Sequence, residues 1–399
     1  MSNTLKFGAG LWATKKGSTL AYNDENGNYK PLPFNFERAG SATRVNKEGL
    51  IEVVSNNEPR IDFSNDAKGA LLLEPSRTNI NTNSESFNTY SLVGGSFISD
   101  NLISPNGFLT ADSFVEDSND SQHTIRKDIA VSAGNYTVSC FVKGADRFLS
   151  IYPQGVGVAY SVFDLNNGTI TKTGGADYID SKIENYGNGW YRCILTYSVI
   201  DGNSLVHLYL SNISSGTGAE APIYIGNGSI MSFYGLQLEQ GSYATSYIPT
   251  SGSIGTRDYD TMPTYLDLTH LNIGNSYTLF LDADLNVNDN NKVFGQITNS
   301  SALTSFTIRN NVGGIRLYNH IDANYPISGI TSSNNKFVIR VDGNSYKVFV
   351  QGSSLSGTLT TQRDLGSLLF NGQNTELKIN NFTINDTALS DAECEALTS

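Results

Sequence analysis

Aromatic side chains with amide and acidic neighbours have the most readily named chemistry in this sequence. An aromatic ring packs against the apolar face of a sugar ring, while Asn, Asp, Gln or Arg side chains bind the sugar hydroxyls. Trp190 follows the tight turn YGNG at the start of an expected strand, and we favour a core role for it over stacking on a ligand. The other candidates, each of which could also be structural, are Tyr152, Tyr160, Tyr186 and Tyr191 in the middle of the chain, and Tyr318, His320 and Tyr325 near its end.

The densest group of acidic residues lies in the segment VEDSNDSQH, where Glu116, Asp117 and Asp120 come close together in sequence. A solvated loop is the simplest interpretation of such a group. The functional alternative is calcium, because hard oxygen ligands on a loop suit that ion. We therefore keep these three residues as candidate calcium ligands, and the sequence indicates no other cofactor.

Sequence motifs for catalysis are absent: the chain has no GxSxG, no HExxH, no P-loop and no GxGxxG. A glycosidase or lyase needs two carboxylates, or a base with an Arg or Tyr, which only the fold brings together. We predict a protein without catalytic residues and keep a polysaccharide depolymerase as an alternative. The histidines are scattered without partners at metal-ligand spacing: His123, His207, His270 and His320.

Composition indicates an all-β protein. The chain has 399 residues, of which 39% are hydrophobic and only 16% charged, against roughly 25% charged in an average globular protein. Segments typical of long amphipathic helices are nearly absent. The net charge of -12, with no cluster of Lys or Arg, argues against nucleic acid as a partner. No apolar run approaches the roughly 20 residues that cross a bilayer, and no export signal follows Met1, so we expect no membrane insertion and synthesis in the cytoplasm.

The three cysteines form no CxxC pair and no Cys/His ligand set. Cys140 and Cys193 each lie inside a strand-like run, where a thiol usually acts as a small buried apolar group. We therefore predict buried, reduced thiols, with a disulfide or a metal site as the less favoured alternatives.

Strand and turn patterns divide the chain into expected modules. We predict a small β-rich N-terminal module over residues 1–80, a two-sheet jelly roll over 81–250, a Pro/Gly/Ser-rich linker over 251–265, and a second sandwich over 266–399. Leu71, Leu72 and Leu73 form an apolar run that Pro75 ends, and Glu74 and Arg77 are expected to pair across this junction.

Tight turns and one helix signal refine this prediction. Asn167-Gly168 and Asp342-Gly343-Asn344 lie between alternating runs and predict hairpins. At the end of the chain, Ser390 and Glu393 match a capping box, while Leu389 and Cys394 match a hydrophobic staple. One short C-terminal helix is therefore expected.

Four segments resemble a recurrent layout of bacteriophage virion proteins, particularly tail-fibre-like and receptor-binding proteins. They are FERAGSATRVNKEGLIEVVSNNEPRIDF, GALLLEPSRTNI, GNGWYRC and YGLQLEQGSYATSYIPTSGSIGTRDYD, which together run from residue 36 to 260. In that layout an N-terminal attachment module leads into a sandwich similar to jelly-roll carbohydrate-binding modules. The last part of the chain resembles concanavalin-like, laminin-G-like sandwiches, with KFVIRVDGNSYKVFVQG matching their central hairpin and FTINDTALSDAECEAL their last strand and helix.

The resemblance implies a virion protein whose lectin-like modules bind bacterial surface polysaccharide or dock on other virion proteins. It carries over no catalytic residue. Two alternatives stay open: a head or tail decoration or adaptor protein with a purely assembly role, and a polysaccharide depolymerase. Virion spikes are commonly trimeric, so a homotrimer is the expected form if the chain oligomerises.

The last long strand, expected over residues 376–384, is predicted to pair antiparallel with the strand over 277–285. Laminin-G-like sandwiches close in this way, and an unpaired final strand would expose its N–H and C=O groups. If the last module is an independent domain, this strand should not pair with the N-terminal or middle module.

Overall fold

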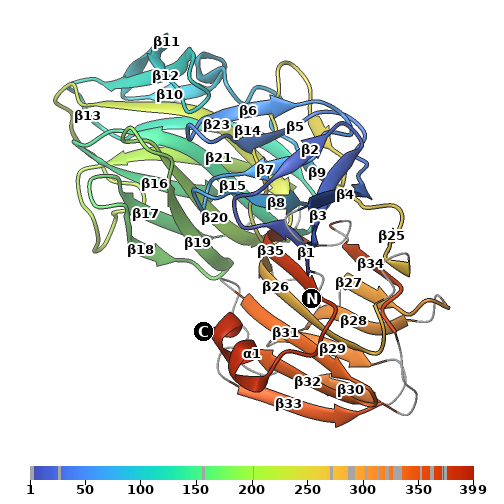
Figure 1. Cartoon of the computed structure of the whole chain (residues 1–399). Coiled ribbons are helices and arrows are strands. Elements are labelled where there is room, and N and C mark those ends of the chain that lie inside the picture. The colour runs from blue at the N-terminus through green and yellow to red at the C-terminus, as the bar shows by residue number, and fades with distance from the viewer. Residues whose placement is uncertain are drawn as a thin grey trace. The chain divides into compact units, whose positions relative to one another are not determined.

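The computed structural model describes residues 4–399 except 26–27, 155–157, 201, 270–272, 286–292, 302–303, 312–313, 320–322, 327–334, 351–352, 360–363, 371 and 373–374. The described residues fold almost entirely into antiparallel β-strands, which confirms the all-β prediction (Figure 1). The short helix α1 (Asp391–Thr398) ends the chain. Among the helices of these residues, none has the length and apolar character needed to cross a membrane.

The chain divides into two compact units, and each contains segments that are distant in sequence. The first unit comprises residues 1–47, 53–76 and 258–399, and the second comprises residues 48–52 and 77–257. The N-terminal segment therefore belongs to the same unit as the C-terminal sandwich. This grouping differs from the expected module of residues 1–80, whereas independent folding of 81–250 stays a prediction.

The second unit is a sandwich of two six-stranded antiparallel sheets. The order of the first sheet is β10 (Ser91–Val93), β14 (His123–Val131), β21 (Gly202–Ser211), β16 (Phe148–Gln154), β17 (Tyr160–Asp164) and β18 (Thr169–Gly174). The order of the second sheet is β11 (Gly95–Ile103), β12 (Leu109–Glu116), β23 (Ile230–Gln240), β15 (Gly134–Lys143), β20 (Tyr191–Val199) and β19 (Tyr178–Asn185). Smaller elements complete the unit: η1 (Phe87–Thr89), and the pairs β13 (Asp120–Ser121) with β22 (Tyr224–Ile225) and β9 (Arg77–Asn79) with β24 (Gly255–Arg257).

Apolar side chains from both sheets form the core of the second unit. Leu149 and Leu208 come from the first sheet, and Val138 and Leu195 come from the second. Cys140 lies directly opposite Cys193 on β15 and β20, and both thiols are free and fully buried. Burial therefore matches the role that the sequence predicts for these two cysteines.

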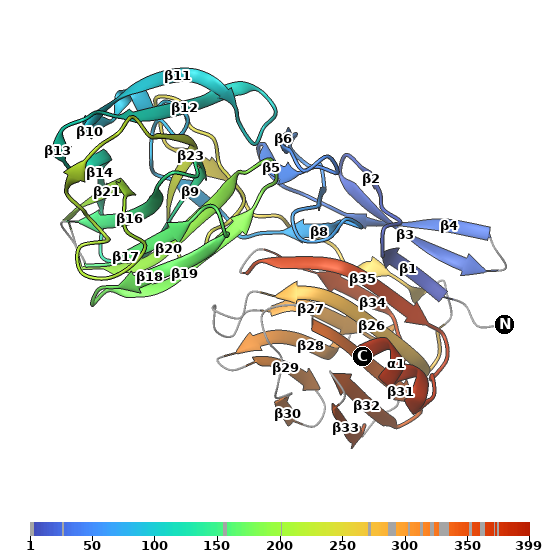
Figure 2. The ribbon, with the colours of Figure 1, turned by 90° about the vertical axis from the view of Figure 1, so that its left-hand side faces the viewer.

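The first unit contains an eleven-stranded sheet that faces a six-stranded sheet (Figure 2). The main path of the larger sheet is β2 (Ala13–Lys15), β3 (Ser18–Glu25), β1 (Thr4–Gly8), β35 (Leu377–Asn385), β26 (Ser276–Leu285), β31 (Asn335–Asp342), β32 (Ser345–Val350) and β33 (Ser353–Thr358). Off this path, β4 (Asn28–Asn35) pairs with β3, and β8 (Ala70–Leu73) pairs with β35 and β7 (Arg60–Asp62). The order of the smaller sheet is β25 (Leu266–Asp267), β34 (Ser367–Phe370), β27 (Val293–Thr298), β28 (Thr304–Asn311), β29 (Gly314–Asn319) and β30 (Ala323–Pro326). A short ribbon is formed by β5 (Ala42–Val45) and β6 (Ile51–Val54).

The last strand, β35, pairs on both of its edges. On one edge it pairs antiparallel with β26, with Leu281 opposite Phe382, as the sequence predicts. On its other edge it pairs with β1 and β8, with Leu5 opposite Ile384 and Leu72 opposite Lys378. The last sandwich is therefore not the independent domain that we expected. The physical reason is that the N-terminal strands cover the edge that β35 would otherwise expose.

The segment over 251–265, expected to be a linker, is mostly exposed but is anchored by three buried side chains. Within the second unit, β24 pairs with β9, and the Arg257 side chain is buried. Within the first unit, Asp260 and Met262 are buried. Arg257 hydrogen-bonds through its Nη1 to Ser246 Oγ at 2.9 Å. Pro, Gly and Ser residues here lie between the buried anchors, and the division between the two units falls inside this segment, after Arg257.

Local signals near the C-terminus are confirmed. Gly343 has a φ of 57° in the turn that joins β31 and β32. Ser390 caps α1, and Ser390 and Glu393 form both hydrogen bonds of the capping box. Leu389 packs against the apolar cluster that contains Cys394, as the staple prediction requires.

Candidate functional site

Neighbouring strands of the second unit's first sheet carry a row of side chains on the face that points away from the core. Arg126 on β14 lies directly opposite His207 on β21, which in turn lies opposite Tyr152 on β16. Residues directly opposite each other in antiparallel strands share a face. Tyr160 on β17 continues the row, because its ring meets that of Tyr152 edge to face with centroids 5.9 Å apart. We call these four residues the cross-strand row.

Strand alternation explains why the row points away from the core. Side chains of a strand alternate between its two faces. Ile151 and Leu208, the sequence neighbours of Tyr152 and His207, are fully buried between the two sheets. Tyr152 and His207 must therefore point to the opposite face. The sandwich core does not use the tyrosine rings of this row.

Tyr209 lies beside the row and fixes the orientation of His207. The His207 Nδ1 and the Tyr209 hydroxyl are 2.9 Å apart, and the Tyr209 and Tyr152 ring centroids are 6.4 Å apart. The Gln154 side-chain amide donates to the same hydroxyl at 3.4 Å. Burial and, to a smaller extent, the positive charge of Arg126 lower the pKa of His207, whereas Asp128 opposes the shift, and the resulting pKa is about 4. His207 is therefore a neutral hydrogen-bonding group at neutral pH.

One side of Tyr160 is occupied by Lys172 and Gly174 of the neighbouring strand. The Lys172 ammonium lies 4.8 Å from the centroid of the Tyr160 ring, and it also forms an ion pair with Glu220. Gly174 lies opposite Tyr160, and a Cβ there would come within 2.4 Å of the Tyr160 hydroxyl oxygen. Glycine at this position therefore makes room for the tyrosine.

The segment over residues 212–221 is attached beside the row by three donors from the sheet. Ser150 donates to the Glu220 carbonyl at 2.9 Å, and Thr171 donates to the Ser214 carbonyl at 2.6 Å. Lys172 adds a bond of 2.6 Å to the Gly216 carbonyl. This segment therefore forms a fixed wall at one side of the row.

Two of the aromatic candidates predicted from the sequence lie elsewhere in the same unit. Tyr186 packs edge to face on Phe141 with centroids 4.8 Å apart. Trp190 is 3% exposed in the same cluster, and its indole N–H donates to the Ile103 carbonyl at 3.1 Å. Trp190 therefore has the core role that we favoured. Tyr191 also packs against a core cluster.

The candidates near the end of the chain are described only in part. Tyr318 lies in β29 opposite Asn324, and Tyr325 lies in β30 opposite Leu317. His320 lies outside the described residues. Tyr318 and Tyr325 therefore share neighbouring strands, and their assignment to a glycan site stays a prediction.

The three candidate calcium ligands have separate partners. Both oxygens of Glu116 are engaged: Arg147 binds at 2.6 Å, the Tyr224 hydroxyl donates at 2.9 Å and the Asn227 backbone N–H donates at 2.8 Å. Asp117 accepts hydrogen bonds from Asn119, and Asp120 is exposed. In the described part of the chain, no group of three or more His, Cys, Asp or Glu side chains is arranged to hold a metal ion. Arg147 therefore neutralises Glu116, and the assignment of these three residues to calcium stays a prediction.

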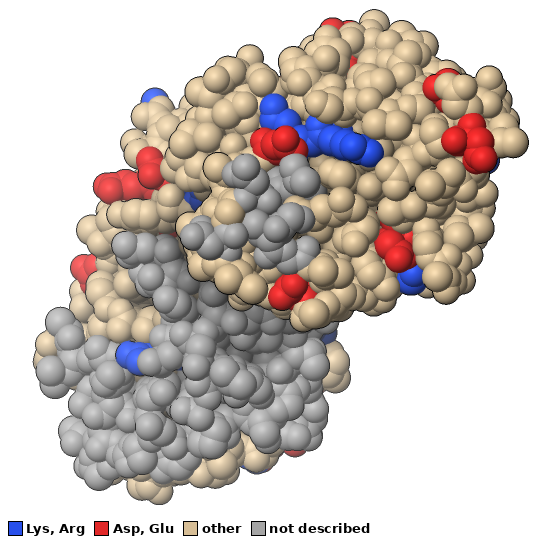
Figure 3. All heavy atoms as spheres, turned by 180° about the vertical axis from the view of Figure 1, so that it is seen from behind, with Lys and Arg blue, Asp and Glu red and all other residues tan. Residues whose placement is uncertain are grey.

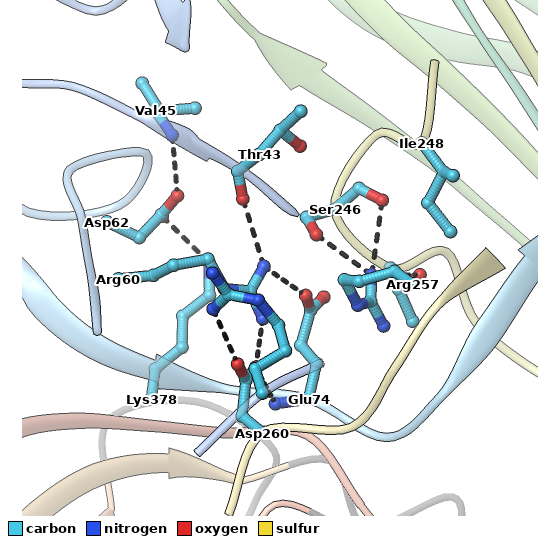
Figure 4. A network of polar contacts seen from close by, with 12 residues as sticks. Thr43, Val45, Arg60, Asp62, Glu74, Ser246, Ile248, Arg257, Asp260 and Lys378 are labelled. Atoms are coloured by element: carbon cyan, nitrogen blue, oxygen red, sulfur yellow. Dashed lines mark hydrogen bonds and ion pairs between the residues drawn. The ribbon is translucent and has the colours of Figure 1, made fainter. Parts of the chain in front are cut away.

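A buried network of charged side chains lies in the first unit (Figure 4). Arg60 on β7 forms ion pairs with Glu74, at 2.7 Å, and with Asp260. Arg38 forms a second pair with Asp260 at 3.0 Å. All four side chains are at most 2% exposed. Because both acids are held by arginines, this network ties chain segments together and offers no free acid or base.

Glu74, which follows the apolar run Leu71, Leu72 and Leu73, belongs to this network. The Glu74 backbone N–H donates to Asp260 Oδ2 at 2.9 Å, and the Asp260 N–H donates to the Glu74 carbonyl at the same distance. We expected Glu74 to pair with Arg77. In the structure Glu74 forms an ion pair with Arg60, and Arg77 forms one with Glu239. Partners separated by 186 residues in sequence could not be recognised from local spacing.

A cavity of about 290 Å³ lies next to this network. It is lined by Glu37, Arg38, Ala39, Asp258, Tyr259 and Thr261. Arg38 donates to the carbonyls of Ser55, at 2.6 Å, and Glu58, at 3.0 Å, in addition to its ion pair. The Arg38 guanidinium that lines this cavity is therefore held by an acid and by backbone carbonyls of the protein.

Sequence reasoning found Tyr152 and Tyr160 but not the other members of the row. His207 looked like one of four scattered histidines, and Arg126 and Tyr209 received no role. The available signal was alternation: in LVHLYLSN the apolar residues Val206 and Leu208 point to the core, so the polar residues between them must share the other face. The order of strands in the sheet was needed to place them beside Tyr152.

Comparisons with known proteins give little further information. No family model matches the chain, and no curated protein matches it. Among solved structures, a leech intramolecular trans-sialidase is 13% identical with a TM-score of 0.27 over 34% of this chain and 26% of its own. The CBM40 module of a Ruminococcus gnavus IT-sialidase is 14% identical, with a TM-score of 0.26 over 34% of this chain and 93% of its own. A Trypanosoma rangeli sialidase is 11% identical, with a TM-score of 0.29 over 96% of this chain and 66% of its own. This chain thus spans about a quarter of the length of the leech enzyme. Because the TM-scores are all below 0.5, these similarities support no conclusion about what this chain binds or catalyses.

Proposed function

We propose that the second unit binds carbohydrate through the cross-strand row, and that the protein attaches to a glycan without cleaving it. The observation that carries this proposal is the meeting of Tyr152 and Tyr160 on a sheet face that the core does not use. Both rings are half-buried, so they are held in place and keep an accessible surface. Ring surface of this kind stacks on the apolar face of a sugar.

Polar groups of the same face complete the proposed site. The Gln154 amide and the Arg126 guanidinium are partly exposed and can bind hydroxyl groups, whereas His207 is 4% exposed and lies beneath them. The row itself contains no pair of carboxylates, which glycoside hydrolysis requires. Binding is therefore the function that this chemistry supports best.

The setting that we propose is a bacteriophage virion, and the ligand is bacterial surface polysaccharide. This part of the proposal is supported by the resemblance of residues 36–260 to virion proteins. Docking on other virion proteins and a trimeric assembly belong to the same proposal. On the face shown in Figure 3, the described Lys and Arg side chains form one short band beside acidic side chains and are otherwise isolated on a mostly uncharged surface, which supports a ligand other than nucleic acid.

A binding assay on an array of bacterial polysaccharides tests this function. We expect the full chain to bind, and we expect Tyr152→Ala and Tyr160→Ala each to weaken binding about five-fold, because stacked rings contribute on the order of 1 kcal/mol. Tyr265→Ala is a matched control, since Tyr265 is 39% exposed in the other unit. Viscosity of the bound polymer should not fall during incubation.

Three results would contradict the proposal. Equal binding by the wild type and both tyrosine variants would show that the row is not the site. Failure to bind any polysaccharide, together with capture by other virion proteins, would favour the assembly role. Loss of viscosity would identify a depolymerase instead.

A further inference from the structure

Arg126 is a positively charged side chain of the row that has no acidic partner among the described residues. A guanidinium has five N–H donors. Arg126 donates to the Gln122 side-chain oxygen at 3.2 Å, and its Nε is buried without a hydrogen-bond partner. Within the described residues, Arg126 forms no ion pair with an acid of the protein. Because Nε is buried, the donors left for an incoming acceptor are those of the two Nη atoms of this partly exposed side chain.

The charges near Arg126 leave it as the dominant cation at its end of the row. Lys172 is neutralised by Glu220. Asp128 is two residues further along β14 and therefore on the same face, but it is exposed to solvent. At His207, after the effect of burial, the positive charge of Arg126 lowers the pKa more than Asp128 raises it. Next to His207 the charge of Arg126 therefore outweighs that of Asp128.

We infer that the glycan bound at the cross-strand row is acidic, with a sugar carboxylate on Arg126 and a neighbouring ring stacked on Tyr152 and Tyr160. The inference rests on the proposed function and deepens it. Guanidinium and carboxylate match as a planar fork with two parallel hydrogen bonds, which are stronger than bonds to a neutral hydroxyl. A carboxylate is thus the ligand group that best meets the donors of Arg126.

The dimensions of the row favour an oligosaccharide over a single sugar. Arg126 and Tyr160 lie on strands that are separated by two others, β21 and β16. Adjacent strands are about 4.8 Å apart, so the two ends of the row are roughly 14 Å apart. The carboxylate and the stacked ring are therefore expected to come from neighbouring units of a polymer. Uronic acids and 2-keto acid sugars share the required carboxylate.

Polymers that differ only in charge test the inference. We would measure the binding of the full chain to polygalacturonic acid, to the same polymer after reduction of its carboxyl groups, and to polysialic acid. We expect at least one acidic polymer to bind, and the reduced polymer to bind at least about ten-fold more weakly than its parent if polygalacturonic acid is the ligand. Binding to polysialic acid alone would assign the site to 2-keto acid sugars.

Charge variants identify the residue responsible. Arg126→Gln should weaken binding of the acidic polymer by about 10-fold to 100-fold, as expected for a lost charged hydrogen bond. Arg126→Lys should recover part of it, because the charge returns without the fork. Asp128→Asn should strengthen binding. Lys182→Gln is the matched control, since Lys182 is exposed on the other sheet.

The outcomes separate the inference from the proposed function. If Tyr152→Ala weakens binding while Arg126→Gln does not, or if the reduced polymer binds as well as its parent, the row binds a neutral glycan and the inference is wrong. Binding to neutral polymers alone would likewise overturn the inference. If all variants at the row bind like the wild type, the proposed function fails as well. Thermal unfolding of each variant checks that the fold is intact.

Discussion

Asp260 is a position in the first unit where one substitution removes two buried charge pairs. Its Oδ1 pairs with Arg38 and its Oδ2 pairs with Arg60. Oδ2 also accepts a hydrogen bond from the backbone N–H of Glu74. Asp260→Ala would leave two buried guanidinium groups short of a counter-charge and one backbone donor without its partner. Arg60 would keep its pair with Glu74.

The cost can be worked out from the burial of the partners. Both arginine side chains and Asp260 have an exposed fraction of 0%. Removing one member of a buried ion pair costs about 3–5 kcal/mol because the remaining charge stays desolvated. For a unit of this size, each kcal/mol shifts Tm by about 2–4 °C, so we expect a fall of about 6–20 °C.

Calorimetry of the full chain is the appropriate assay. We expect the unfolding transition of the first unit to move down, and that of the second unit to stay in place, because all the network residues belong to the first unit. Asp258→Ala is the matched control, since Asp258 is exposed and only two residues away. A shift below about 2 °C for Asp260→Ala, or an equal shift for both variants, would refute the argument that this network stabilises the unit.

Three further predictions concern groups whose pKa or reactivity is set by burial. Burial lowers the pKa of His207, so we expect its NMR titration midpoint at about pH 4, and a midpoint of 6 or above would contradict this. The neutral imidazole contributes its full stabilisation above about pH 6.5, and this stabilisation is lost as the pH falls toward 4. Cys140 and Cys193 are buried with raised pKa values, so thiol reagents should label them only after denaturation, and rapid labelling of the native chain would be the opposite result. Burial alone would raise the pKa of Asp62, but Lys378 and hydrogen bonds lower it, so its stabilisation is present above about pH 4 and lost in acid. Asp62→Asn should therefore flatten the dependence of unfolding free energy on pH below that value, and an unchanged acid slope would count against the ion pair.

Local features of the fold were predictable because they depend on neighbours in sequence. The turn at Gly343 needs a residue that tolerates positive φ, and the cap of α1 needs Ser390 and Glu393 three residues apart. The burial of Cys140 and Cys193 follows from their place in apolar runs. Each of these signals is complete within about ten residues, so the sequence contains all of the physics that decides it.

The assignment of chain segments to units was not predictable in the same way. Composition indicated a linker near Asp260, yet Asp260 is bound by residues about 190 to 220 positions earlier. The edge of β35 accepts β1 and β8 because unpaired backbone groups at a sheet edge gain hydrogen bonds from any strand that reaches them. Spacing in the sequence does not show which strand will do so.

The sequence alone determined the all-β class and singled out the tyrosines at positions 152 and 160 as candidates for stacking. Only the tertiary structure decided that Arg126 and His207 stand in line with them, because strands β14, β21, β16 and β17 are neighbours in the sheet although they are scattered in the chain. It also decided that Glu116 binds Arg147, and that Trp190 fills a core. A side chain's chemistry is inherent in its residue type, but its partners depend on strand order, which is fixed by the burial of whole sheets.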